Sequence, residues 1–311
     1  MSVVLSEHLP LLASAPEGVK RIRNLILGLA ISGRLVPQDA GDQDASVAFE
    51  RHRISRDAAR EVLLRKFSIP NTWLWCEVGD LCVLRTGATP STLKAENFGG
   101  DIRWLVSGDI HKKEIFDCDG RITEQGVASS NCKLLPKDSV LIALNGQGKT
   151  RATVAILRVP AACNQSLVAM TPIRSEILAP EFLFLNLWFR YLEVRDITGQ
   201  KQRRGLNMGL VSDLPISLPP LAEQHRIIAK VDELMTLCDR LEAEQKDSSN
   251  AHAKLVEILL GTLTQSIDAD ELTANWQRLN QHFDTLFSTE SSLDALKQTI
   301  RDGQARVARP E

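Results

Sequence analysis

The sequence lacks the features that mark membrane, secreted and metal-binding proteins. Its longest apolar run, around Leu25–Ile31, is about half as long as a membrane span requires. The short apolar stretch near the N-terminus follows no basic segment, so it does not resemble a signal peptide. The six cysteines form no Cys-x-x-Cys pair and no cluster with histidine, which argues against structural zinc and a disulfide framework. We therefore expect a cytoplasmic protein without membrane contact, with buried cysteine side chains and no metal.

An excess of one charge is also missing. The chain has 37 Lys and Arg against 39 Asp and Glu, a net charge of −2. The whole chain therefore lacks the basic character of many nucleic-acid-binding proteins. Residues 1–67 hold 10 basic and 8 acidic side chains, residues 68–215 hold 17 and 15, and residues 216–311 hold 10 and 16. An acidic last third behind a mildly basic middle fits a molecule of two parts.

Hydrophobic periodicity predicts an α+β fold in three parts. Helical spacing of apolar residues predicts helices over 19–36 and 45–66. The following segment holds short apolar runs between turn residues, which predict a mixed α/β domain. The predicted strands are Leu81–Leu84, Val140–Leu144, Thr153–Leu157 and Leu167–Met170. One helix is predicted in this domain, over Pro180–Leu192. We therefore assign 1–67 to an N-terminal helical segment, 68–217 to the mixed α/β domain and 218–311 to a helical region.

The helical region contains a heptad seam and is expected to act as an assembly arm. Five apolar residues recur there at spacings of four and three: Ile227, Val231, Leu234, Cys238 and Leu241. Such a seam predicts burial against another helix. Helical patterning resumes over Ala251–Leu263 and Leu272–Phe287, so about 80 residues of helix follow a complete domain. A short repeat relates Ile22–Ile26 to Leu296–Ile300.

Recognisable catalytic patterns are missing from the sequence. The segment Ala143–Thr150 fits a relaxed phosphate-binding loop, but such a loop requires a helix directly after its Lys-Thr pair. The residues that follow Lys149 and Thr150 favour a strand instead. The six histidines form no ligand-spaced pair, and no Gly-x-Ser-x-Gly elbow is present. We therefore expect a protein that is not an enzyme, with nucleotide hydrolysis at Lys149 as the catalytic alternative.

Segments in all three parts resemble one known family. These segments are Ala15–Lys20 with Leu29–Gln38, then Trp73–Leu81 with Thr86–Ser91, Phe98–Leu105 and Ser107–Ile110, and last Leu214–Leu241. They are similar to conserved regions of the specificity subunit of type I restriction-modification systems. The third segment is the most specific, because it matches the family's signature where the recognition domain meets the conserved helix. Full members carry two recognition domains, whereas this chain has one, so the resemblance implies a half-length subunit.

The resemblance also implies partners and a division of labour. The expected partners are double-stranded DNA, a modification subunit that carries S-adenosylmethionine and methylates adenine, and a motor-nuclease restriction subunit. No cofactor is expected in this chain itself. A half-length subunit would pair with a second copy through its helices and would read a two-fold symmetric split site. The alternative is a truncated adaptor that binds modification subunits without productive DNA targeting.

Polar loops of the mixed domain hold the candidate DNA contacts. Lys and Arg can bind phosphates, while Asn, Gln and Arg can read base edges. The segment 198–207 ranks first for its density of cationic and amide groups, followed by 145–151. The candidates are Gln200, Lys201, Gln202, Arg203, Arg204, Asn207, Asn145, Gln147, Lys149, Thr150, Arg151, Lys112, Lys113, Asn164 and Gln165. The rings of Trp73, Trp75 and Trp104 are expected to lie in the core.

Overall fold

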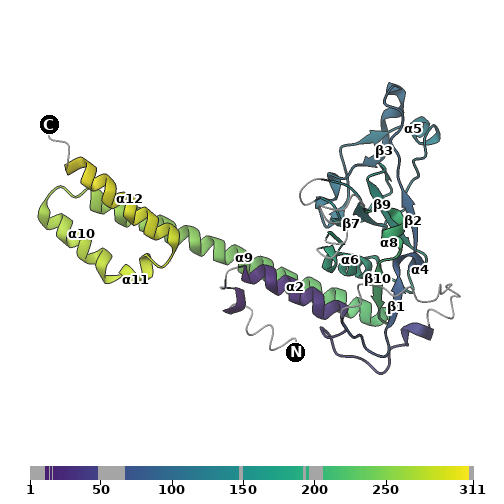
Figure 1. The fold of residues 1–311 in the computed structure, drawn as a ribbon, viewed down its shortest axis with the longest axis horizontal. Helices are drawn as coiled ribbons and strands as arrows, with labels where there is room; N and C mark the ends of the chain where they lie inside the picture. The colour runs from purple at the N-terminus through teal and green to yellow at the C-terminus, as the bar shows by residue number, and fades with distance from the viewer. Residues whose placement is uncertain are drawn as a thin grey trace. The chain divides into compact units, whose positions relative to one another are not determined.

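The chain forms two compact units, one containing residues 20–236 and the other residues 237–311 with the short segment 13–19. The computed structural model describes residues 11–13, 15, 17–47, 67–146, 150–191, 194–195 and 206–307, with side chains to residue 302. Sheets and long helices are both present, which confirms the predicted α+β class (Figure 1). Where the three predicted parts begin and end stays a prediction.

A mixed five-stranded sheet lies at the centre of the first unit. Its strand order is β2 (Cys82–Thr86), β9 (Leu167–Pro172), β6 (Val140–Ala143), β7 (Val154–Leu157) and β4 (Glu114–Ile115). β4 runs parallel to β7, and the other neighbours are antiparallel. Every residue of β6 and β7 is buried, as is the first half of β9. Strands buried on both faces read as unbroken apolar runs, which explains why these three were predicted correctly.

Helix α6 (Pro180–Phe189) packs against β6 and β7. Proline at its first position suits the fixed φ of that residue and leaves no amide unsatisfied. Arg158, which directly follows β7, forms ion pairs with Glu114 of β4, Asp138 before β6 and Glu181 of α6. The nitrogen–oxygen distances are 2.6, 2.7 and 2.7 Å. This ion-pair network fixes the start of α6 beside the end of β7, so the helix runs back across the sheet.

Smaller elements complete this unit. The second sheet has the order β5 (Arg121–Ile122), β3 (Phe98–Leu105), β8 (Ala162–Cys163). The short helices are α4 (Val78–Leu81), η1 (Ala95–Asn97), η2 (Asp109–His111), α5 (Glu124–Ala128) and α8 (Met208–Ser212). Strands β1 (Leu74–Glu77) and β10 (Pro215–Leu218) pair antiparallel, Leu74 facing Leu218. This pairing brings the two ends of the mixed domain together, and the sequence did not predict it.

Helix α2 (Gly18–Ile31) covers the first part of the heptad seam. It runs beside the start of α9 (Leu221–Thr264) (Figure 1), and Arg23 Nη1 lies 4.0 Å from Met235 Sδ. The buried apolar residues of the two helices are Ile22, Ile26, Leu27, Ala30 and Ile31 on α2, and Ile227, Val231 and Leu234 on α9. Cys238 is also buried, whereas Leu241 is half-buried. The seam residues Ile227, Val231 and Leu234 therefore already have a helix partner within the chain.

The second unit is helical. Beyond residue 236 it contains the rest of α9, then α10 (Ala269–Gln281), α11 (Phe283–Leu286) and α12 (Glu290–Val307). Their shared core consists of Val256, Leu260, Leu279, Leu286, Phe287 and Leu296. The two helices predicted between residues 227 and 263 are one 44-residue helix, because the residues between them are polar all round but contain no helix breaker. The helix predicted over Leu272–Phe287 is instead divided at His282 into α10 and α11.

Several sequence-based expectations can be compared directly with these elements. All six cysteine side chains are buried, as predicted. Trp73 is buried, while Trp75 and Trp104 are partly so. The helix predicted over 45–66 lies almost entirely outside the described residues, of which 45–47 are helical. Among the helices described, none combines the length and the apolar character needed to cross a bilayer.

A buried carboxylate, Glu223, joins the N-terminal segment, the mixed domain and helix α9. Its side chain is 1% exposed. Gln38 Nε2 donates to Glu223 Oε1 at 2.5 Å, and Trp73 Nε1 donates to Oε2 at 2.8 Å. One turn on, Arg226 holds Asp42 through two hydrogen bonds of 3.0 and 2.6 Å. The start of α9 is therefore bonded to residues that lie 150 to 185 positions away in the sequence.

The side chain of the next residue, Gln224, forms a second set of buried hydrogen bonds, with backbone groups. Its Oε1 accepts from the Ala179 amide at 2.9 Å, and its Nε2 donates to the carbonyls of Ile177 and Pro219 at 2.7 and 3.0 Å. Because an unpaired buried polar group is expensive, these bonds define one geometry for the helix start. Glu223 and Gln224 thus occupy the junction of domain and helix.

Substitutions of Glu223 should separate the contribution of its hydrogen bonds from that of its charge. Burial raises the pKa of the Glu223 carboxyl above the ordinary 4.5, against the bonds from Trp73 and Gln38, which lower it. The native state therefore holds this proton to higher pH than the unfolded chain, and ionisation of Glu223 lowers stability as pH rises just above 4.5. Glu223→Gln should remove this contribution while keeping an acceptor for Trp73. Glu223→Ala should cost about 1–3 kcal/mol at every pH, because it leaves buried donors unpaired.

Urea unfolding between pH 5 and 8 measures both effects. The Glu223→Gln protein should show a flatter dependence of the unfolding free energy on pH than the wild type. A Glu223→Ala protein as stable as wild type would show that the junction does not depend on this carboxylate.

Candidate functional site

The predicted contact residues come from separate loops of the mixed domain. Gln147, Lys149 and the run Gln200–Arg204 lie outside the described residues. The described candidates that are exposed are Asn145, Lys112, Lys113, Gln165 and Asn207. Thr150, Arg151 and Asn164 are partly buried.

Strand directions bring most of these loops to one end of the five-stranded sheet. β6 ends at Ala143 opposite Leu167, the first residue of β9. The connection 144–153 therefore leaves the sheet beside residues 164–166, and the Leu144 amide donates to the Ser166 carbonyl at 2.8 Å. β2 ends at Thr86 opposite Val168, so it too points to this end. We call this region, with residues 87–89, 111–113, 144–146, 150–153 and 164–166, the loop end of the sheet.

Hydrogen bonds connect the loops with one another. His111 Nε2 lies 3.3 Å from Thr150 Oγ1, which places Lys112 and Lys113 next to the 144–153 connection. Arg195 Nη1 donates to the Arg151 carbonyl at 3.1 Å and to Tyr191 Oη at 3.1 Å. Because α6 runs back across the sheet, Tyr191 and Arg195, which follow it, lie at the loop end. Residues 111–113, 144–146, 150–153, 164–166 and 195 thus lie within one region.

The amide candidates differ in how their side chains are used. Asn207 Oδ1 caps α8 by accepting from the Leu210 amide at 3.0 Å. Asn164 Oδ1 accepts from the Ser166 amide at 3.0 Å, and Gln165 Oε1 accepts from Thr89 Oγ1 at 2.8 Å. In these three residues the side-chain oxygen accepts a hydrogen bond from the local backbone or from a neighbouring loop. The NH₂ group of the same side chain is a donor that can face a ligand. Asn145 follows β6 and is exposed.

Lys113 is tied to the long helix. Its Nζ lies 2.8 Å from Asp232 Oδ1 on α9 and 6.0 Å from the centre of the Phe184 ring on α6. Both charged side chains are about half exposed, at 48% and 53%, so the pair is screened by solvent and stabilises the fold little. Its structural effect is to hold the loop end against the first turns of α9.

The segment Ala143–Thr150 does not lead into a helix. Strand β7 begins at Val154, four residues after Thr150, as the sequence predicted. A helix N-terminus facing a phosphate group is therefore not formed directly after Lys149 and Thr150. Among the described residues, no group of three or more His, Cys, Asp or Glu side chains is arranged to hold a metal ion.

Sequence reasoning missed several residues at the loop end. His111, Trp188, Tyr191 and Arg195 were not proposed as candidates, although all four lie beside those that were. Their positions follow from the direction of α6, which apolar patterning alone does not give. A signal was nevertheless present, since Tyr191 lies at the end of the predicted helix and Arg195 lies between that helix and the cationic segment 198–207.

Comparison with known proteins assigns this arrangement to a family. Residues 70–248 match the type I restriction modification DNA specificity domain, and the match covers more than half of the chain. The chain belongs to this family. The type I restriction enzyme EcoAI specificity subunit of Escherichia coli is 31% identical over 314 residues, which cover 91% of this chain and 51% of that protein. The EcoEI specificity subunit of the same species is 33% identical over 316 residues, covering 91% and 50%.

The chain spans about half the length of these curated specificity subunits. Among solved structures, the HsdS subunit from Thermoanaerobacter tengcongensis is 19% identical with a TM-score of 0.44, covering 74% of this chain and 50% of that one. A second structure, the S subunit of a type I system from M. genitalium, is 16% identical with a TM-score of 0.44, covering 80% and 56%.

The segments that resemble the specificity family meet at two places in the fold. Gln38, Trp73 and Glu223 come from the first, second and third segments, and they are joined by the hydrogen bonds described above. Gly87, also in the second segment, lies so close to β8 that a Cβ there would come within 1.8 Å of the Cys163 carbonyl oxygen. The family pattern therefore marks residues that close the domain, whereas the candidate contact residues lie mainly outside those segments.

Arg195 should limit the mobility of the 144–153 connection. Arg195→Met keeps much of the side-chain length but removes the donor to the Arg151 carbonyl and to Tyr191. Loss of one such bond corresponds to about 1 kcal/mol, or roughly a fivefold faster opening. Hydrogen–deuterium exchange should therefore accelerate in peptides that cover residues 150–153 and stay unchanged over β9. Equal exchange in both proteins would show that Arg195 does not restrain the connection.

Proposed function

We propose that this chain reads one half of a split DNA target through the loop end of its sheet. The observation that carries the proposal is the convergence of residues 111–113, 144–146, 150–153, 164–166 and 195 at one end of the sheet, in a chain of the specificity family. Loops on a rigid scaffold are the usual location of variable recognition residues. The segment 198–207 contains three cationic and three amide side chains, which would add to the DNA contacts.

The chemistry of the loop end fits duplex DNA. Lys112, Lys113 and Arg151 can bind phosphates, which would fix the position of the domain on the duplex. Asn145, Gln147 and Arg203 can form paired hydrogen bonds with base edges in the major groove. The chain as a whole carries a charge of −2, so this local cationic group, rather than overall charge, would supply the salt-dependent attraction.

We further propose that catalysis resides in partner subunits. A modification subunit would bind S-adenosylmethionine and methylate adenine, and a restriction subunit would join the same assembly. The relatives EcoAI and EcoEI are named as specificity subunits of type I restriction enzymes, which supports partners of this kind. The role of this chain would be to select the DNA site and to position those partners on it.

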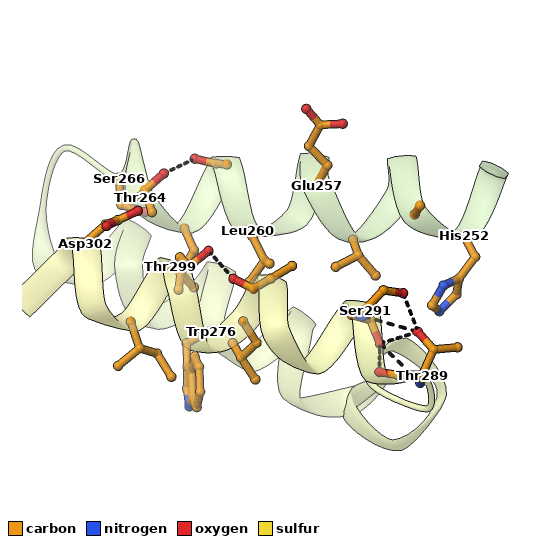
Figure 2. A pocket seen from close by; sticks show the side chains of 18 of the residues that line it. His252, Glu257, Leu260, Thr264, Ser266, Trp276, Thr289, Ser291, Thr299 and Asp302 are labelled. Atoms are coloured by element: carbon orange, nitrogen blue, oxygen red, sulfur yellow. Dashed lines mark hydrogen bonds between the residues drawn. The ribbon is translucent and has the colours of Figure 1, made fainter. Parts of the chain in front are cut away.

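A second copy of the chain would supply the second recognition domain. The chain is half the length of its relatives, so two copies would match one full-length specificity subunit. The helical unit leaves apolar side chains exposed on three helices: Leu255 and Ile258 on α9, Leu272 and Trp276 on α10, and Leu293 and Ile300 on α12. Figure 2 shows an adjoining groove of about 770 Å³, with Leu260 and Trp276 among its lining residues. These surfaces, rather than the heptad seam, would bury apolar area between copies.

The seam itself is a poor place to test pairing. Val231 and Leu234 are each 1% exposed, and the neighbouring Met235 lies 4.0 Å from Arg23 on α2 of the same chain. Aspartate at these positions would bury uncompensated charge and disrupt the chain's own packing. We therefore propose that the exposed apolar residues of the helical unit, and not Val231 and Leu234, mediate contact between copies.

The alternative function is a truncated adaptor that recruits modification subunits without productive DNA targeting. The half-length match to full specificity subunits favours it. Light scattering of the chain alone and with its modification subunit separates the two. A dimer that recruits the subunit supports split-site reading, and a monomer that recruits it supports the adaptor.

The cationic pair Arg203 and Arg204 should contribute phosphate contacts. Replacing both with Ala should weaken binding to a mixed-sequence duplex and reduce the slope of log K against log salt by roughly 2, since each phosphate contact contributes about 0.9. Fluorescence anisotropy between 50 and 200 mM salt measures the slope.

Lys137 and Arg174 provide the matched control for the arginine pair. Both are exposed; Lys137 precedes β6 and Arg174 follows β9, so both lie at the opposite end of the sheet from the loop end. Replacing both with Ala removes the same charge and should leave the slope unchanged. An unchanged slope in the arginine variant would remove segment 198–207 from the DNA interface.

Charge on the exposed helical surface should prevent pairing. Leu255→Asp with Ile258→Asp should convert a dimer to a monomer, because two carboxylates would face a desolvated apolar contact. Both residues are about half exposed, so the monomer should keep its fold. Gln245→Asp with Ser248→Asp adds the same charge at the same spacing on exposed positions of α9 and should leave the dimer intact. Light scattering gives the mass, and a dimer that persists in the Leu255/Ile258 variant contradicts pairing through this surface.

A further inference from the structure

A depression with aromatic walls lies at the loop end, between η2, β7 and α6. Its volume is about 340 Å³. Phe184, Trp188 and Tyr191 line it from the α6 side, and His111, Lys112 and Lys113 line it from the η2 side. Its size is at the lower end of the range for pockets that hold small organic ligands. None of these residues belongs to the segments that resemble the specificity family.

Two of the aromatic side chains that line the depression are only partly buried in the protein core. Phe184 is buried, and its ring centre lies 5.5 Å from that of Trp188 at an angle of 45°. Trp188 and Tyr191, by contrast, keep part of their surfaces exposed on the depression. Tyr191 is the only tyrosine of the chain. Two partly exposed aromatic side chains next to each other provide a surface on which a planar ring can stack.

Cationic groups surround this aromatic surface. The Arg195 guanidinium lies 5.2 Å from the centre of the Tyr191 ring, and Lys113 Nζ lies 6.0 Å from that of Phe184. Lys112 is exposed on the rim. Among the described residues, no acidic side chain lines the depression, although Asp232 on α9 pairs with Lys113 from outside it. A ligand that complements this arrangement has a planar aromatic ring and an attached anion.

We propose that this depression binds a single nucleotide, with its base against Trp188 and Tyr191 and its phosphate beside Lys112. The inference rests on the proposed DNA-reading function, because the source expected for the nucleotide is an unstacked position in the bound DNA. An unmodified amino-acid side chain supplies no such combination of flat ring and phosphate, so an unmodified peptide fits this lining less well. The same chemistry would accept a free mononucleotide, and the experiment separates these two sources.

Photo-cross-linking tests the proposal on the intact chain. The probe is a 30-base-pair mixed-sequence duplex with a two-nucleotide bulge containing 5-iodouracil, and the comparison is the same duplex fully paired, with 5-iodouracil at that position. Irradiation at 50 mM salt should join the bulged probe to Trp188 or Tyr191, identified by mass spectrometry of the digested complex. Competition with unlabelled bulged DNA should remove this cross-link. Removal by millimolar AMP as well would identify a site that also accepts free nucleotides.

Two variants extend the test to affinity. Tyr191→Ala should weaken binding of the bulged duplex roughly tenfold, as loss of one stacking ring does, and should change binding of the paired duplex less. Tyr191→Phe keeps the ring and should bind like wild type. The Lys137→Ala, Arg174→Ala protein is the control for changes remote from the depression, and circular dichroism checks that each variant is folded.

The outcomes of the two proposals are distinct. Cross-links confined to other residues, with DNA binding intact, overturn the nucleotide depression and leave DNA reading in place. Equal weakening of bulged and paired duplexes by Tyr191→Ala also overturns it, since the ring would then act only through the shape of the loops. Failure of every duplex to bind overturns the DNA-reading function itself.

Discussion

The buried carboxylate of Glu223 is the interaction on which the arrangement of the first unit depends. A carboxylate in the interior is unfavourable unless its oxygens are hydrogen-bonded, and here the donors come from Gln38 and Trp73. Each donor belongs to a different stretch of the chain, so the charge is stabilised only when all three stretches are in place. The adjacent Gln224 applies the same constraint to the backbone before α6 and before α9. The helix therefore leaves the domain in one direction.

The direction of the strands determines where the loops gather. β6 and β9 are antiparallel neighbours, so the chain after β6 and the chain before β9 must lie at the same end. The Arg158 network holds the start of α6 at the opposite end, which returns Tyr191 and Arg195 to the loops. Convergence of the polar segments is thus a consequence of topology and of one ion-pair network. The loop residues themselves contribute few of the bonds that enforce it.

The sequence predicts which segments of this fold are buried better than it predicts which segments pair with each other. β6, β7 and β9 are visible because they are buried on both faces. β1 and β10 are not, since their pairing depends on residues some 140 positions apart and each is only four residues long. Periodicity identified Ile227, Val231 and Leu234 as buried but could not identify α2 as the helix beside them, because a buried face does not specify its partner.

The candidate contact residues were likewise identified by residue type, whereas their positions relative to one another were not predicted. Residue type alone pointed to Lys112, Lys113 and Arg151, and the topology then placed them in one region. Trp188 and Tyr191 were not recognised, because an aromatic residue near a helix end has the same signature whether it packs in a core or lines a depression. Only the direction of α6 distinguishes the two.

The separation of these two networks bears on how the domain can change its specificity. Glu223, Gln224 and Gly87 satisfy buried donors, buried carbonyls and a close backbone approach, so most substitutions there affect folding. Asn145, Lys112 and Gln165 are exposed, and side chains at such positions can be exchanged with small effects on stability. A scaffold closed by a buried carboxylate and loops held by backbone bonds can therefore present different side chains to DNA without a new fold. In this domain the candidate contact residues lie outside the segments that resemble the family, and the two sets touch where Thr89 of the second segment donates to Gln165.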